Sequence, residues 1–93
     1  MIYGWDPKKA VDNLKWHKVS FDEATSVFTD PFALTFDDPE HSLDEQRYIT
    51  IGTSMKQRVL FLSHVDRGED QVRIISARRA TRQEAYAYQE SRK

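Results

Sequence analysis

The strongest constraint on the fold is the apolar run "RVLFLSHV" at residues 58–65. It is apolar on both faces apart from Ser63 and His64, so a strand formed here must be covered on both sides, as in the middle of a sheet. Strand-like runs at 47–53 and 71–77 flank it, and the turn before the second contains Gly68. Short connections of this kind are typical of antiparallel neighbours. The sequence therefore predicts an antiparallel sheet with residues 58–65 near its centre.

Further elements complete an α+β fold in the order β-α-α-β-β-β-β-α. Residues 1–5 and 32–36 are expected to form strands, and the last four strands are expected to form an antiparallel meander. Helices are predicted from residue 7, from residue 21 and over 81–92, and we expect them to cover one face of the sheet. Their starts are marked by capping residues, namely Asp6 with Pro7, Ser20 with Glu23, and Thr81 with Glu84.

Length and composition narrow the class of protein. Ninety-three residues predict a single domain, 1–93, with a thin core. The chain has no cysteine, which rules out disulfides and thiolate zinc sites. No apolar run approaches the ~18 residues of a membrane span, and the start shows no signal-peptide pattern. With only three glycines there is no phosphate-binding glycine loop. We expect a cytoplasmic protein without a cofactor and without membrane association.

The low net charge of −1 hides two opposed halves. Residues 1–46 carry four Lys against ten Asp or Glu, whereas residues 47–93 carry ten Lys or Arg against five acids. Eight of those ten basic residues are arginine, whose planar donor fork matches phosphate oxygens. One interpretation is an anionic partner such as nucleic acid. The other is that the arginines pair with the acidic half across the fold.

Four of the arginines lie in "RIISARRATRQE", residues 73–84. Strict alternation would put Val72, Ile74 and Ser76 on one face of a strand and Arg73, Ile75 and Ala77 on the other. Arg78 and Arg79 would then leave the sheet on opposite sides, and Arg82 would enter the first turn of the last helix. Either these guanidinium groups bind phosphate, or Arg78 and Arg79 fold back onto the acidic segment 37–45.

Three histidines are candidates for proton transfer or metal binding. His64 shares a predicted strand face with Leu60 and Leu62, where a lone histidine is usually a core residue and becomes catalytic only beside the arginines. His41 stands in an acidic turn, but its spacing from the neighbouring carboxylates matches no known metal site. His17 ends the first helix, where its cationic form suits the helix dipole. No metal site is predicted.

Three blocks of the chain resemble the BrnT family of bacterial type II toxins: "WDPKKAVDNLKWHKVSFDEATSVF", "DPEHSLDEQRYITIG" and "RIISARRATRQEAYAY". The resemblance implies a RelE-like fold, a ribonuclease that arrests translation, and a BrnA-like antitoxin that binds operator DNA. A dimer within a toxin–antitoxin heterotetramer is compatible with it. One departure is Lys18, where the family usually has glycine. The matching motif positions are Trp5, Asp6, Pro7, Asn13, His17, His41, Ser42, Glu45, Arg47, Ser76, Ala77, Arg78, Ala80 and Glu84.

The resemblance leads to a hypothesis for the chemistry. RNA is cut without metal when its 2′-hydroxyl attacks the adjacent phosphate, which needs a base, an acid and cations beside the phosphorus. We expect Arg78 and Arg79, supported by Arg47, to stabilise that charge, and His64, or failing that His41, to move protons. Arg73, Arg82, Tyr86 and Tyr88 are expected to bind RNA, the tyrosines by stacking. The alternative is an inactive binding module that acts through its antitoxin. No helix-turn-helix pattern suggests direct DNA binding.

Overall fold

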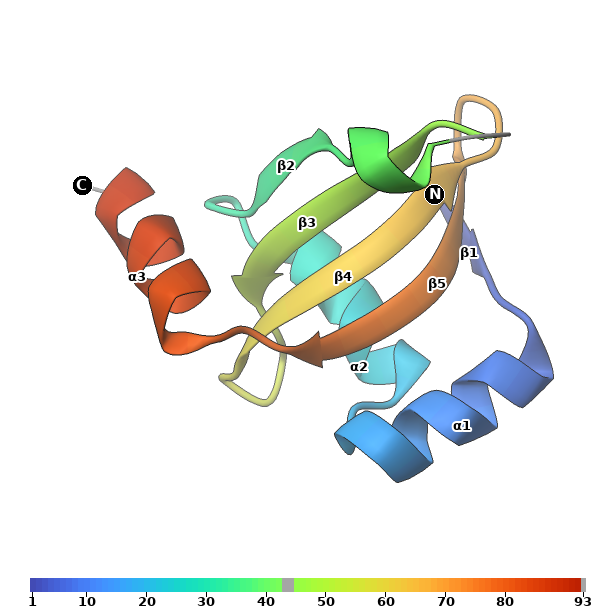
Figure 1. Cartoon of the computed structure of the whole chain (residues 1–93), viewed down its shortest axis with the longest axis horizontal. Coiled ribbons are helices and arrows are strands. Elements are labelled where there is room, and N and C mark those ends of the chain that lie inside the picture. The colour runs from blue at the N-terminus through green and yellow to red at the C-terminus, as the bar shows by residue number, and fades with distance from the viewer. Residues whose placement is uncertain (43–44, 93) are drawn as a thin grey trace.

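Five strands form one mixed sheet in the order β1-β5-β4-β3-β2 (Figure 1). The computed structural model describes residues 1–42 and 45–92. Strands β2 to β5 pair antiparallel with their neighbours in sequence, which confirms the predicted meander, and β4 is the central strand. The first strand adds a feature that was not predicted, because it pairs parallel with β5. The strands are β1 (Ile2–Gly4), β2 (Leu34–Asp37), β3 (Arg47–Thr53), β4 (Val59–Asp66) and β5 (Gln71–Arg79).

The helices begin where the capping residues predicted. Asp6 accepts a hydrogen bond from the Lys8 N–H at 2.8 Å, and Thr81 forms a complete capping box with Glu84. The box at Ser20 is only half formed, because the Glu23 carboxylate turns into the interior toward Arg58 and Ser54. The described helices are α1 (Pro7–His17), α2 (Phe21–Ser26) and α3 (Arg82–Ser91), with 3-10 turns η1 (Val27–Thr29) and η2 (Pro39–His41).

The two faces of the sheet are covered by different helices. The main core lies under α1 and α2 and includes Phe21, Leu60 and Ile74 (Figure 1). A smaller cluster on the other face joins Ile49 and Ile51 to Tyr88 of α3. The prediction that all helices cover one face is therefore wrong, and the reason is Tyr88, which anchors α3 to β3 on the second face. Because α3 covers only one end of that face, the rest stays open.

A β-bulge between β4 and β5 changes which side chains share a face. Ser63 pairs with Ser76 and His64 pairs with Ile74, so Ile75 has no partner on β4. Such an extra residue reverses the alternation beyond it. The predicted alternation therefore fails after Ile74: Ala77, instead of Ser76, joins Ile74 in the buried core. The bulge thereby turns Arg73 and Arg78 to the same face, although they are an odd number of residues apart.

Helix α1 binds the part of the β5 edge that β1 leaves unpaired, and it does so through a polar side chain. The Asn13 amide donates to the carbonyls of Val19 and Ala77, and its oxygen accepts from the Ala77 N–H. By contrast, the apolar Val11 and Leu14 of the same helix are largely exposed. Lys18 takes the left-handed conformation with φ of 60°, which a lysine adopts at a cost that a glycine would avoid.

Candidate active site

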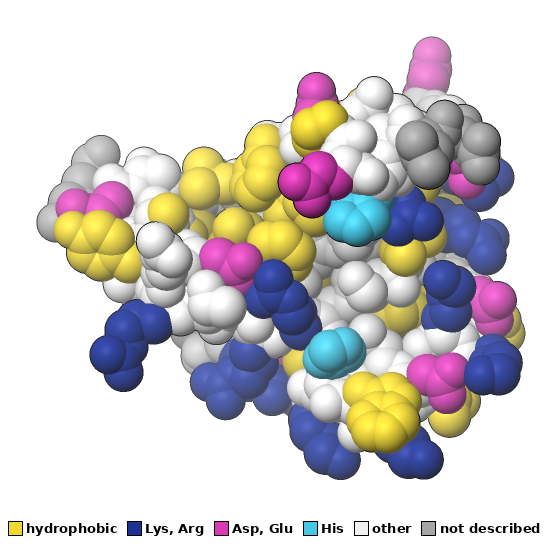
Figure 2. All heavy atoms as spheres, viewed as in Figure 1, with side chains coloured by type: hydrophobic (Ala, Val, Ile, Leu, Met, Phe, Trp, Pro, Cys, Tyr) yellow, Lys and Arg dark blue, Asp and Glu magenta, His cyan; other side chains and the backbone are white. Residues whose placement is uncertain are grey.

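A pocket of about 450 Å³ lies on the open face of the sheet, beside the segment that connects β2 to β3. Figure 2 shows this face: Lys and Arg side chains lie mainly over its centre and its lower and right-hand parts, with Asp and Glu side chains among them, and hydrophobic side chains gather at the upper left. The pocket brings together two arginines, a histidine, two serines and three carboxylates with several apolar side chains. It is lined by Phe36, Asp37, Asp38, Glu40, His41, Arg47, Ile49, Phe61, Ser63, Ile75, Ser76 and Arg78.

Arg78 is held in one orientation at the wall of this pocket. Its guanidinium makes a bidentate ion pair with Glu84, with hydrogen bonds of 2.8 and 3.0 Å, and a third bond to the Arg79 carbonyl. Its centre also lies 3.9 Å from the centroid of the Phe61 ring. The hydrogen bond from Arg78 is the main reason why the pKa of Glu84 lies below its ordinary value. Three of five guanidinium donors are thus used, which leaves two for a ligand.

His41 sits across the pocket and pairs with an aspartate. Its Nδ1 lies 3.0 Å from Asp38 Oδ2, and the ring is 61% exposed. The 3-10 turn η2 brings the two side chains, which are three positions apart in the sequence, into contact. Ser42 holds the turn by donating a hydrogen bond to the Asp38 carbonyl at 2.6 Å. An aspartate bonded to one imidazole nitrogen fixes the tautomer and leaves Nε2 to exchange protons. A histidine held in this way is one of the side chains that can serve in general acid–base catalysis.

Arg47 begins β3 directly after that segment. Its N–H donates to Ser42 Oγ at 2.9 Å, and its carbonyl accepts from the Asp38 N–H at 2.9 Å. In the described part of the chain, the Arg47 guanidinium has no ion-pair partner. Sequence reasoning found Arg47 but missed the roles of Asp38 and Glu84. The sequence signal for Asp38 is its spacing of three positions from His41. The signal for Glu84 is an acidic residue close in sequence to Arg78, with which a guanidinium can pair in a bidentate way.

His64 lies on the other face of the sheet and is 2% exposed. It packs edge-on against Phe28 and stacks with Tyr48, while its ring nitrogens contact Thr50 and Asp66. Burial lowers its pKa, and the Asp66 carboxylate offsets part of that effect. The predicted proton transfer by His64 does not fit this position, because the bulged sheet separates it from Arg78. His64 is the core histidine that the alternative interpretation described.

Other predicted residues are also placed away from the pocket. Arg79 pairs with Leu60, so it lies on the α1–α2 side of the sheet and does not line the pocket. Tyr88 is 1% exposed and bonds to Asp30 and Thr53, which rules out stacking on RNA without unfolding α3. Arg82 and Tyr86 are exposed on α3 but do not line the pocket. These positions follow from the bulge and from the second-face packing of α3.

The arginines pair only in part with the acidic half of the chain. Arg78 pairs with Glu84 of α3 instead of the acidic segment, whereas Arg67 does pair with Glu45 of that segment at 2.9 Å.

Within residues 1–42 and 45–92, no three His, Cys, Asp or Glu side chains converge as metal ligands would. None of the helices in that same part of the chain has the length and apolarity to cross a membrane.

Comparison with known proteins gives the family. The family model "Ribonuclease toxin, BrnT, of type II toxin-antitoxin system" matches residues 5–84. The chain is also similar in fold to the crystal structure of the Brucella abortus ribonuclease toxin BrnT, with a TM-score of 0.68 and 20% identity over 88% of this chain and 100% of that one. A search of curated proteins found no match. Since the family model covers most of its length, the chain belongs to the BrnT family of ribonuclease toxins of type II toxin–antitoxin systems.

Proposed function

We propose that this toxin cuts RNA in the pocket formed by His41, Arg47 and Arg78, by attack of the RNA 2′-hydroxyl on the adjacent phosphate. The observation that carries the proposal is that these three side chains line one pocket on the open sheet face. An endoribonuclease needs a proton carrier and cations around a single phosphate. Of the residues that the sequence offered for these two tasks, this set is the one that lies together.

Each residue has a distinct task in the proposed reaction. His41 takes the proton of the attacking 2′-hydroxyl through Nε2 and returns it to the 5′-oxygen as the bond from phosphorus to that oxygen breaks, with Asp38 as a positioning residue that holds the ring. Arg78 directs its two remaining donors at the phosphate, and the ion pair with Glu84 means that no reorganisation is needed when negative charge develops. Arg47 supplies a second cation from the opposite side of the pocket. Ser63 and Ser76 are hydroxyl donors on the pocket floor.

Family membership supports the wider role. A toxin of a type II system has an antitoxin partner, which we propose to be BrnA-like and to carry the operator-binding element, so that operator DNA is contacted only through it. We further propose that cleavage arrests translation, occurs in the cytoplasm and needs no metal ion. The RelE-like description of the fold, and a toxin dimer within a heterotetramer with the antitoxin, belong to the same proposal.

Two neighbouring arginines provide the matched test. Purified toxin is incubated with a structured RNA in excess EDTA, and cleavage by Arg78→Ala is compared with cleavage by Arg79→Ala. Removal of one preorganised transition-state donor costs about 10²–10³ in rate. We therefore expect that loss for Arg78→Ala and less than a threefold change for Arg79→Ala, which removes the same charge on the other side of the sheet. Equal effects of the two variants would contradict the proposal.

One observation favours the alternative of an inactive binding module. Glu84 already neutralises Arg78, as it would if the pocket served only to hold an antitoxin segment. The same EDTA assay separates the two functions, because a binding module shows no cleavage by the unmodified toxin. Induced expression without the antitoxin gives a second readout: a ribonuclease stops growth and shortens transcripts, whereas a binding module does neither.

A further inference from the structure

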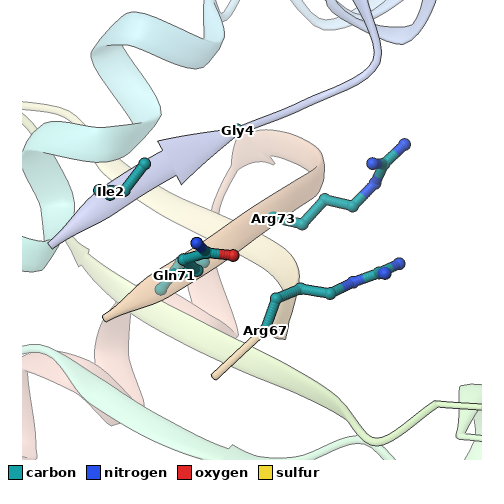
Figure 3. Close-up of a pocket in the computed structure, with 6 residues that line it drawn as sticks. Ile2, Gly4, Arg67, Gln71 and Arg73 are labelled. Atoms are coloured by element: carbon teal, nitrogen blue, oxygen red, sulfur yellow. The ribbon is translucent and has the colours of Figure 1, made fainter. Parts of the chain in front are cut away.

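A second basic pocket lies at the β1 end of the same sheet. It has a volume of about 310 Å³ and is lined by residues of β1 and β5 together with Arg67. Figure 3 shows Arg67 and Arg73 extending side by side in the same direction, with Gln71 beside them. A Cβ built at Gly4, which pairs with Arg73, would meet no atom within 4 Å. Two guanidinium groups therefore border open space that a ligand can enter.

Because of the bulge at Ile75, the arginines of this second pocket and those of the active site lie on the same face of the sheet. Arg73 pairs with Val65, and Val65 pairs with Arg47 on the next strand, so the three form one row across the sheet. Directly opposed residues share a face, and the bulge puts Arg78 on this face as well. Four residues of β5, one of them the bulged Ile75, lie between Arg73 and Arg78. Their partners Val65 and Phe61 are four positions apart on β4, a span of roughly 13 Å at the rise of a strand. A single RNA chain that binds in the active site can reach the second pocket along β5.

The two arginines are available to an anion. The Arg73 side chain has no ion-pair or hydrogen-bond partner among the described residues. Arg67 contacts Glu45 at 2.9 Å, but both side chains are about half exposed (48% and 47%). Exposed pairs of this kind contribute little and exchange readily. A backbone phosphate that contacts both guanidinium groups offers Arg67 a second partner, whose two non-bridging oxygens can accept bidentate hydrogen bonds.

We propose that Arg67 and Arg73 bind a backbone phosphate of the RNA, a few nucleotides away from the phosphate that is cut. The inference rests on the proposed function for its substrate, and it assigns a subsite that acts on binding and not on the bond-breaking step. Arginine pairs that contact only phosphate position a nucleic acid without reading its sequence. The subsite therefore favours long RNA over short RNA, irrespective of the bases.

The test measures binding of a non-cleavable 2′-O-methyl RNA of roughly 12 nucleotides, within the range of single-strand sites, by fluorescence anisotropy over a range of salt concentrations. Each lost phosphate contact reduces the slope of log K against log salt by about 0.7. We expect that reduction for Arg73→Ala, a smaller one for Arg67→Ala, and tighter binding for Glu45→Gln. The control is Lys8→Ala, which removes an exposed charge on α1 and should leave the slope unchanged.

A second arm compares RNA lengths in the cleavage assay. For Arg73→Ala we expect KM for the longer RNA to rise roughly tenfold, the weight of one charged hydrogen bond, with cleavage of a dinucleotide unchanged. A slope equal to that of Lys8→Ala, or equal losses on both RNAs, would overturn the subsite. Competition by inorganic phosphate at concentrations far below those at which other salts act would assign the pocket to free phosphate instead. If the unmodified toxin cleaves nothing, the proposed function fails, and the salt arm still decides the subsite.

Discussion

The two faces of the sheet use the same strands for opposite purposes. The face under α1 and α2 is closed: Leu60, Leu62 and Ile74 are fully buried there, and the one histidine among them is surrounded by aromatic rings and hydrogen bonds. The other face is only partly covered by α3, and its histidine stands exposed beside an aspartate and two arginines. The residue type alone therefore does not decide the environment of a histidine; the face of the sheet on which it lies does.

The comparison also shows how one inserted residue determines which side chains share the open face. Without the bulge at Ile75, strict alternation would place Arg73 and Arg78 on different faces. With it, Arg47, Arg73 and Arg78 share the open face, and Arg79 lies on the other. The bulge thus brings these arginines together on the open face, where Asp37, Asp38 and Glu40 also line the pocket.

The largest effect is expected from the exposed histidine. His41→Gln should reduce RNA cleavage by about 10²–10⁴, the usual contribution of a proton-transfer group, and should leave the unfolding transition unchanged because the ring is exposed. Initial rates in EDTA and a thermal melt measure the two properties. His17→Gln, at the end of α1, serves as the control. Full activity of His41→Gln would remove the proton carrier from the account.

The next largest effect is expected from a buried ion pair on the sheet face under α1 and α2, where a substitution should lower stability instead of activity. The Glu23 carboxylate is fully buried and bonded to Arg58 and Ser54, and the hydrogen bond from Arg58 lowers its pKa. Breaking a buried pair typically costs 3–5 kcal/mol, and since Arg58 is partly exposed we expect about 3 kcal/mol for Glu23→Gln. Urea unfolding checks this against Glu69→Gln in an exposed turn. Equal stability of the two variants would show that the buried contacts of Glu23 with Arg58 and Ser54 do not stabilise the fold.

Two tyrosines of α3 give a smaller contrast. Tyr88 is buried and bonded to the Asp30 carboxylate, so Tyr88→Phe should lose about 1.5–3 kcal/mol, the range for hydrogen bonds to charged groups. Tyr86 is 64% exposed, so Tyr86→Phe should stay within about 0.5 kcal/mol of the unmodified protein. Parallel urea titrations measure both. A destabilisation by Tyr86→Phe as large as that by Tyr88→Phe would show that α3 docks differently.

The smallest effect concerns pH. The pKa of His64 is lowered in the folded protein by burial, so the folded state holds the neutral ring while the unfolded chain protonates near pH 6.5. The stability this provides is present above about pH 6.5 and is lost as the pH falls toward the folded-state pKa. Unfolding free energies measured from pH 7.5 to 5.5 should decline, and the decline should be shallower in His64→Gln. An unchanged slope in that variant would contradict the assignment.

Much of the fold could be predicted because local signals agreed with the tertiary structure. The apolar run of β4, the caps at Asp6 and Thr81, and the short turns between strands are all local. The bulge could not be predicted, since it depends on the pairing of two strands and leaves no mark in "RIISAR". Because of the bulge, the strand faces predicted for Ser76 and Ala77 were wrong. Of the predicted site residues, Arg47, Arg78 and His41 line one pocket, whereas His64 lies buried on the other face. The sequence could not place His64, because its surroundings depend on long-range packing.

The central claim is that RNA binds the open face, and the three histidines allow it to be tested directly. Proton NMR of the imidazole resonances is recorded while the non-cleavable RNA is added. The account predicts saturable shifts for His41 and none for His64, which lies across the sheet and is 2% exposed. Shifts of His64 or His17 without a shift of His41 would contradict it.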